Sequence, residues 1–231
     1  MGLPLTSGPV ALFLALDHGP GFAASAAAGS LAGALAEIAF CLAYGGFARH
    51  RWPVAVLAAS AAFAAAAAVV QHATLAPAVL AAGVVVALAA ALSLLPRGHG
   101  GPAPAPPPRW DLPARMAITT ALVVGITGAA ATLGPRLSGV LASFPVYATI
   151  LTVFAHRAGA GPAVQVLRGL LLGLFAYAGF FVVLGALIER VGIPAAFGLA
   201  TATAVAIQAA SLALVLLRAG SGKLERSHSG T

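Results

Sequence analysis

The chain contains 231 residues, of which 61% are hydrophobic and only 7% are charged, and its mean hydropathy is +1.01. A soluble domain carries about 25% charged residues. The composition therefore excludes a soluble enzyme, a nucleic-acid-binding domain and a disordered chain. The formal net charge of +7 indicates the excess of basic residues that membrane proteins place in their cytoplasmic loops.

Eight apolar segments follow one another along the chain, separated by turns rich in Gly, Pro and charged residues. A spanning helix needs about 20 apolar residues, and most of the segments reach that length. The sequence therefore predicts an all-α, polytopic transmembrane bundle of about eight spans. The first segment is short and contains two prolines, which leaves open a broken or re-entrant piece. The segments are 3–16, 22–47, 52–70, 75–95, 116–133, 137–155, 169–188 and 191–217.

A stretch rich in proline and glycine, residues 96–113, divides the chain into two halves. Such a composition is typical of an extended linker. We expect an N-terminal membrane half at 1–95 with about four helices and a C-terminal half at 114–217 with about four more. The polar residues 218–231 predict a disordered cytoplasmic tail.

The basic residues are distributed unequally between the two sides that this arrangement defines. Because short cytoplasmic loops accumulate Lys and Arg, the excess predicts that both termini face the cytoplasm of a bacterial inner membrane. The first basic residue is Arg49, so we expect no cleavable signal peptide. Only Arg136 and Arg190 fall on the outer side, whereas the cytoplasmic side collects Arg49, Arg51, Arg97, Arg109, Arg115, Arg157, Arg168, Arg218, Lys223 and Arg226.

The two halves share an order of features that suggests an inverted repeat. Ser7-Gly8-Pro9 resembles Ser143-Phe144-Pro145, and a histidine follows each. Because an odd number of spans separates the matched segments, the two halves would face opposite ways, as in many transporters. Chance agreement in a chain rich in alanine and glycine is the alternative. The spacing also agrees between Gly33, Ala36, Phe40 and Gly45 and the set Gly173, Ala176, Phe180 and Gly185.

Four short motifs occur in the C-terminal half: Phe144-Pro145, His156, Leu167-Arg168 and Pro194-Ala195-Ala196-Phe197. Through these motifs residues 114–217 resemble the GlpM-like family of small bacterial inner-membrane proteins. It implies an inner-membrane location and a compact helical bundle. It assigns no catalytic residue.

Glu37 is the one acidic residue inside an expected span. A charged carboxylate at mid-membrane is unfavourable by about 3 kcal/mol, so such a residue faces the bundle interior, finds a partner or stays protonated. Two interpretations remain open. Glu37 is either a site of proton or cation coupling, or a protonated carboxyl hydrogen-bonded within the bundle.

The Ser-x-Pro segments provide the other candidates for a solute or ion pathway. A proline inside a helix frees a carbonyl, and hydroxyl groups beside it offer further oxygens to a polar ligand where the backbone lines a cavity. The alternative is a packing kink with the hydroxyls bonded to their own helix. The candidates are Ser7, Pro9, Ser143, Pro145 and Thr149.

Arg136, with Ser138 close by, lies on the outer side against the general charge distribution. This position suggests contact with an anionic solute group. A contact with lipid phosphate is the alternative. Arg168 and Trp52 are interpreted as interfacial anchors.

The sequence predicts no metal site and no cofactor, because the histidines are scattered and Cys41 is the single cysteine. We find no nucleophile motif or paired carboxylates, so we do not expect an enzyme. The leading interpretation is transport or permeation of an unknown small solute. The alternative is a non-catalytic accessory or scaffolding subunit of a membrane complex. The expected partner is the lipid bilayer, with a homo-oligomer or another membrane protein left open and nucleic acid excluded.

Overall fold

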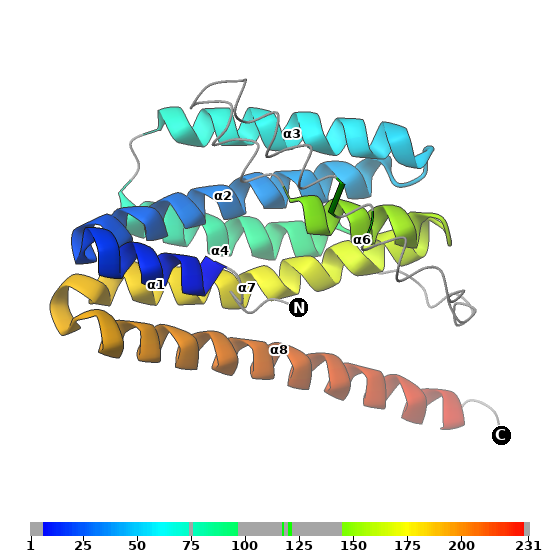
Figure 1. The fold of residues 1–231 in the computed structure, drawn as a ribbon. Helices are drawn as coiled ribbons and strands as arrows, with labels where there is room; N and C mark the ends of the chain where they lie inside the picture. The colour runs from blue at the N-terminus through cyan, green and yellow to red at the C-terminus, as the bar shows by residue number, and fades with distance from the viewer. Residues whose placement is uncertain (1–6, 74–75, 97–116, 118–119, 122–144, 229–231) are drawn as a thin grey trace. The chain divides into compact units, whose positions relative to one another are not determined.

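A computed structural model describes residues 7–73, 76–96, 117, 120–121 and 145–228. Every regular element in these ranges is a helix (Figure 1). The chain divides into two compact units. Unit 1 comprises Met1–Leu31 and Leu172–Thr231, and unit 2 comprises Ala32–Leu171.

Two long helices are shared by the units. Helix α2 covers Pro20–Phe47 and α7 covers Ala160–Val191, so each helix contributes one part to unit 1 and the other part to unit 2. Unit 1 also contains α1 (Ser7–His18) and α8 (Ile193–His228). Unit 2 also contains α3 (Trp52–His72), α4 (Pro77–Leu94) and α6 (Val146–His156).

A glycine with positive φ lies directly before each of the long helices α2, α7 and α8. Gly19 has φ +87° and closes α1, because its N–H donates to the Ala15 carbonyl at 3.0 Å. Pro20 then starts α2, at a position that suits its fixed φ. Gly159, with φ +126°, directly precedes α7, and Gly192, with φ +80°, directly precedes α8. The turns therefore lie where the sequence changes from apolar to small or polar residues.

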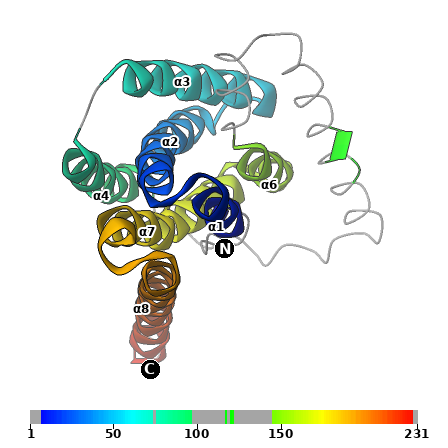
Figure 2. The same ribbon diagram turned by 60° about the vertical axis from the view of Figure 1, so that its left-hand side comes forward.

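Unit 2 has its core around the second part of α2, which lies next to both α3 and α4 (Figures 1 and 2). Helix α3 also approaches α6. The largest fully buried side chains of this unit are Tyr44, Phe40, Phe63, Leu88 and Leu167. Small alanines between them permit close approach of the helices, as is typical of membrane bundles.

Unit 1 joins the beginning of α2 to the end of α7. A Cβ atom at Gly185 would lie 3.4 Å from the Ala27 Cβ, so these two helix segments are in close contact. Helix α8 packs on α7 through an edge-on ring contact between Phe180 and Phe197, with centroids 6.0 Å apart, and it also approaches α1.

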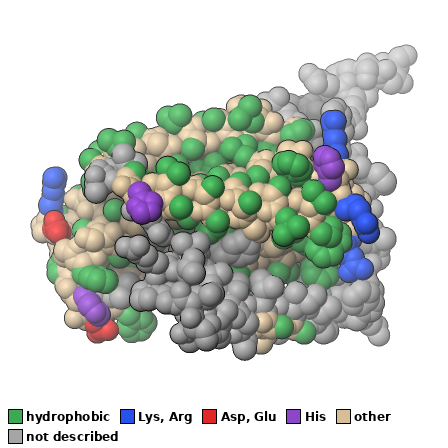
Figure 3. Space-filling model, turned by 90° about the horizontal axis from the view of Figure 1, so that it is seen from above, with side chains coloured by type: hydrophobic (Ala, Val, Ile, Leu, Met, Phe, Trp, Pro, Cys, Tyr) green, Lys and Arg blue, Asp and Glu red, His purple; other side chains and the backbone are tan. Residues whose placement is uncertain are grey.

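Five of the described helices are long and apolar enough to cross a membrane by length and composition: α2, α3, α4, α7 and α8. Large apolar side chains are exposed on them, for example Leu57 at 70% and Val86 at 67%. In Figure 3 hydrophobic side chains are spread over the face that carries α3, while the basic side chains drawn lie at the two ends of the helices. This distribution is that of a multi-pass helical membrane protein.

The eight expected spans are not confirmed. Segment 116–133 and the beginning of segment 137–155 lie largely outside the described residues, and α1 and α6 have 12 and 11 residues. Helix α7 begins nine positions before the expected segment 169–188. Helix α8 continues to His228, past position 218, where we expected a disordered tail to begin.

Candidate functional site

Glu37 lies in the second part of α2, inside a membrane-spanning segment, and is half-buried. Within the described part of the chain it has neither a hydrogen bond nor a salt bridge. Among the residues that the structure describes, no basic side chain forms an ion pair with this carboxyl group.

Two further titratable side chains share the helix face that carries Glu37. Cys41 is one turn further along α2 and Tyr44 lies two turns from Glu37, and residues spaced by four and seven lie on one face of a helix. Both side chains are completely buried. The face thus carries a carboxyl, a thiol and a phenol in sequence towards the end of α2.

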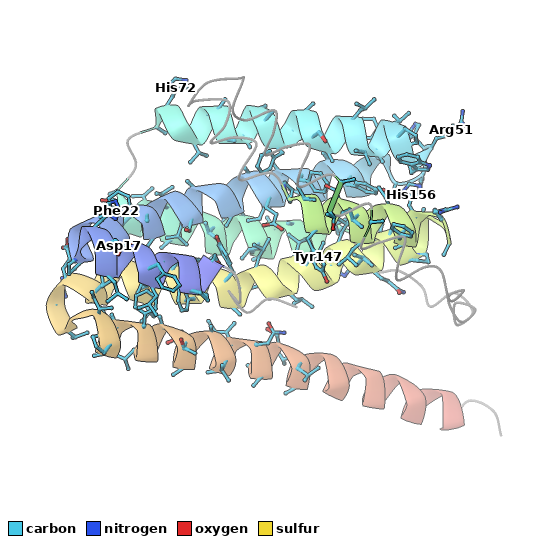
Figure 4. All side chains as sticks on the ribbon, viewed as in Figure 1. Asp17, Phe22, Arg51, His72, Tyr147 and His156 are labelled. Carbon is cyan, nitrogen blue, oxygen red and sulfur yellow. The ribbon has the colours of Figure 1, made fainter. Side chains whose placement is uncertain are left out.

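Tyr44 is joined to α6 by a hydrogen bond. Its hydroxyl oxygen is 3.1 Å from Nδ1 of His156, and Nε2 of His156 is 3.1 Å from the carbonyl oxygen of His50. A carbonyl only accepts, so the Nε2–H of His156 donates to His50. In the neutral imidazole Nδ1 is then the acceptor, and the Tyr44 hydroxyl donates to it. Figure 4 shows His156 at the end of unit 2 that also carries Arg51.

The end of α4 is bound by a side chain of α7. Nη1 of Arg168 donates to the carbonyls of Leu92 at 2.9 Å and Leu95 at 2.6 Å. The last carbonyls of a helix have no partner within the helix, and a guanidinium group near them also interacts favourably with the helix dipole. Arg168 therefore fixes α4 to the first part of α7.

Helix α6 places Pro145 and Thr149 differently from the sequence-based interpretation. Pro145 is the N-cap residue, so it lies at the start of α6 and not inside a helix. Its carbonyl accepts from the Thr149 N–H and the Thr149 hydroxyl, each at 2.9 Å. Thr152, fully buried, donates to the Ala148 carbonyl at 2.7 Å. The Pro145 carbonyl is thus occupied by its own helix, as in the alternative interpretation of this segment.

The remaining pathway candidates are not brought to Glu37 by any described contact. Ser7 is half-buried and Pro9 is exposed, and both belong to the first turn of α1 in unit 1. Pro9 at the start of a helix breaks no internal hydrogen bond. Arg136, Ser138 and Ser143 lie outside the described residues.

Among the described residues, no group of three or more His, Cys, Asp or Glu side chains is arranged to hold a metal ion. The arrangement in unit 2 is instead a single carboxyl on a helix face that leads to a hydrogen-bonded phenol and imidazole.

The sequence analysis did not select Cys41 and Tyr44 as pathway residues, and it used His156 only for the family resemblance and the repeat. The helical spacing of 37, 41 and 44 would have placed the first two with Glu37. The contact between Tyr44 and His156 joins positions far apart in the chain, so no local sequence pattern predicts it.

Comparison of the chain with protein-family models, with curated proteins and with solved structures gives no match. The class of the protein therefore follows from its own helices. It is a multi-pass α-helical membrane protein with at least five candidate spans in the described residues.

Proposed function

We propose that this protein transports a small solute across the bacterial inner membrane and is built from an inverted repeat, in which α1, α2 and α3 correspond to α6, α7 and α8. The observation that carries the proposal is that the two compact units share four parts. Each has one short helix, the beginning of one long helix, the end of the other long helix, and the helix that follows that end, and unit 2 contains α4 in addition.

The division between the units supports this correspondence. It falls after Leu31 in α2 and after Leu171 in α7. These two residues are separated by the same number of positions as Gly33 and Gly173, from which the repeat was predicted. The turns agree as well, since Gly19 and Gly159 have the same separation and both adopt positive φ directly before a long helix.

Close contacts recur at matching positions. In unit 2 a Cβ atom at Gly45 would lie 3.9 Å from Cδ1 of Leu167, and in unit 1 one at Gly185 would lie 3.4 Å from the Cβ of Ala27. Gly185 is the counterpart of Gly45, and Ala27 is the counterpart of Leu167. In the same way, α3 approaches α6 in unit 2 and α1 approaches α8 in unit 1.

Inverted repeats with interrupted helices are a common plan of secondary transporters, whose solute and ion sites lie near mid-membrane. The residue of α7 that corresponds to Glu37 is Tyr177, so the acidic side chain occurs in one repeat and not in the other. This difference between the repeats is why Glu37 suits such a site. The proposed pathway includes Glu37, with Ser7, Pro9, Arg136, Ser138, Ser143, Pro145 and Thr149 as further candidates.

The proposal includes both the cytoplasmic location of the termini and the relationship of residues 114–217 to the GlpM-like family. Arg49, Arg51 and Arg157, in the turns of unit 2, then face the cytoplasm together. In unit 1, the last turns of α1 and α7 carry Asp17, Glu189 and Arg190, which fits the opposite side of the membrane.

The lone cysteine provides a test that needs no knowledge of the solute. Cys41 is fully buried one turn from Glu37. A transporter that opens a water-filled pathway to Glu37 exposes Cys41 for part of the time, and a membrane-impermeant thiol reagent then modifies it in sealed vesicles. We expect the modification of Cys41 to be slow but to reach completion. Mass spectrometry measures its extent over time.

The matched control is Ala59→Cys in a Cys41→Ser background. Ala59 is also fully buried, but it lies in a different helix, α3. The transport proposal requires modification at position 41 and none at position 59. Equal protection of both positions in vesicles of either orientation is the behaviour of a dry scaffolding bundle, and it would contradict the proposal.

A further inference from the structure

A histidine joins two turns at one end of unit 2. His156, the last residue of α6, donates its Nε2–H to the carbonyl of His50 at 3.1 Å. His50 lies in the turn between α2 and α3, and the turn between α6 and α7 begins directly after His156. The hydrogen bond therefore fixes these two turns beside each other, although 106 positions separate the two histidines.

Three arginines adjoin this contact. Arg49 and Arg51 are the chain neighbours of His50, and Arg157 is the chain neighbour of His156. Consecutive Cα atoms are about 3.8 Å apart, so all three side chains start from backbone that adjoins a single hydrogen bond. All three are exposed, and Figure 4 shows Arg51 and His156 at the same end of unit 2. Arg49, Arg51 and Arg157 are called the basic patch below.

The charge of the basic patch is not balanced within the part of unit 2 that the structure describes. The acidic residue of this part is Glu37, which lies inside α2, about 15 Å along the helix axis from its end at Phe47. No ion pair to the three arginines occurs among the described residues. Because like charges repel one another, an anion that binds among the arginines would stabilise this arrangement.

The helix ends beside the patch are satisfied by other donors. The Phe47 carbonyl at the end of α2 accepts from the His50 N–H, and the His156 carbonyl at the end of α6 accepts from the Gly159 N–H, each at 2.9 Å. A fourth basic residue of unit 2, Arg168, is bonded to the last carbonyls of α4. The basic patch is therefore not used for capping, and its guanidinium groups can bind a partner outside the chain.

The patch lies at the level of the lipid headgroups. The candidate span of α3 begins at Trp52, directly after Arg51, and has 19 residues, which is about 28 Å and matches the hydrocarbon thickness of a bilayer. Trp52 is 48% exposed, as is typical of a tryptophan at the membrane interface. Further along α3, Val54 and Leu57 are also exposed. Guanidinium groups and an apolar helix face thus follow one another in the order of a phosphate and its acyl chains.

We propose that Arg49, Arg51 and Arg157 form a binding site for an anionic phospholipid, whose phosphate lies between the two turns and whose acyl chains lie along α3. Guanidinium groups bind phosphate oxygens through paired, charge-assisted hydrogen bonds, and basic sites at the ends of membrane helices recognise anionic headgroups. The inference goes beyond the proposed transport function and does not depend on it.

The test measures lipid binding at this place, with the full chain in a neutral detergent. Trp110→Phe removes the other tryptophan of the chain, so that quenching of Trp52 fluorescence by phosphatidylglycerol with brominated acyl chains reports binding beside the patch. We expect saturable quenching by this lipid and much weaker quenching by brominated phosphatidylcholine, which has no net charge.

Substitution of the arginines by glutamine is expected to weaken the quenching. Each single variant, Arg49→Gln, Arg51→Gln or Arg157→Gln, raises the Kd of phosphatidylglycerol about fivefold, which is the effect of one basic residue near an anionic headgroup. The triple variant raises it about a hundredfold. Arg190→Gln is the matched control, because it removes the same charge from an exposed arginine at the end of α7 in unit 1. It is expected to keep the original Kd.

Glycerol 3-phosphate distinguishes a lipid from a soluble phosphate, and we expect it not to displace the brominated lipid. Displacement at concentrations similar to those of the lipid would identify a soluble phosphate as the ligand and overturn the proposal. Equal quenching by the two lipids, an unchanged Kd in the triple variant, or an equal loss in Arg190→Gln would also overturn it. Thermal unfolding verifies the fold of each variant, and substitution of the three arginines by lysine, which keeps the charge, is expected to cause a smaller loss than glutamine.

Discussion

Gly45 of α2 lies directly against the side chain of Leu95, so that a Cβ atom added to the glycine would overlap Cδ2 of the leucine. Leu95 is itself fixed, because it is 3% exposed, its N–H donates to the Ala91 carbonyl, and its carbonyl accepts from Arg168. The absence of a side chain at position 45 is therefore what allows α2 and the end of α4 to approach each other.

We predict that Gly45→Ala lowers the stability of the protein, because overpacking a fixed contact costs about 1–3 kcal/mol. The neighbouring Gly46→Ala is the control, since nothing lies within 4 Å of its added Cβ and alanine favours a helix by about 1 kcal/mol. Thermal unfolding in detergent measures both variants. Equal unfolding midpoints would show that the contact with Leu95 is not restrictive.

Removing the guanidinium group of Arg168 is expected to loosen α4. Arg168→Ala leaves the Leu92 and Leu95 carbonyls without their donor, and a hydrogen bond from a charged group contributes about 1.5–3 kcal/mol. Arg168→Lys keeps the charge but offers less suitable geometry for two acceptors, so we expect an intermediate loss. Hydrogen exchange at the end of α4 measures the effect, and unchanged protection there in Arg168→Ala would exclude the capping role.

We predict that Gly159→Ala and Gly19→Ala destabilise the protein because of the backbone conformation at these positions and not because of steric overlap. Their φ values of +126° and +87° are unfavourable for any residue with a Cβ atom, at a cost of about 1–2 kcal/mol. Gly161→Ala is the control, because Gly161 lies in the first turn of α7 with nothing within 4 Å of an added Cβ. The expected order of unfolding midpoints places Gly161→Ala above Gly159→Ala, and the reverse order would contradict it.

Tyr44→Phe is expected to have a modest effect on the stability of the protein. The variant keeps the buried ring and its edge contact with His156, at 5.7 Å between centroids, and loses one hydrogen bond, worth about 0.5–1.5 kcal/mol. Thr152→Val, which removes a hydroxyl bonded only to its own helix, serves as the comparison in the same unfolding assay. A loss for Tyr44→Phe far above this range would indicate that the hydroxyl has partners beyond His156.

Much of the fold was predictable because it depends on local composition. Helices are separated at Gly19, at 48–51 and at Gly192, at or next to the gaps between the expected apolar segments, since glycine, proline and charged residues interrupt apolar runs in any context. The beginning of α7 was predicted too late, because residues 160–168 contain Gly161, Pro162 and Arg168, which weaken an apolar signal without preventing a helix whose first turn accepts proline.

The candidate site was predictable only in part. Glu37 was evident, because a carboxyl in an apolar helix is unfavourable wherever that helix lies. Pro145 and Thr149 were given the wrong local context, since the start of α6 at Val146 turns a proline expected inside a helix into its N-cap residue. Ser143, Arg136 and Ser138 remain predictions, because they lie outside the described residues.

The sequence by itself determined that this is a helical membrane protein, because the transfer of apolar side chains into lipid depends on composition and length and needs no knowledge of contacts. It also isolated Glu37. Only the tertiary structure decided that Tyr44 meets His156 and that Arg168 binds the end of α4. These pairs are far apart in the chain, and the helix packing that joins them follows from the steric fit of small residues such as Gly45, which no local pattern of hydrophobicity records.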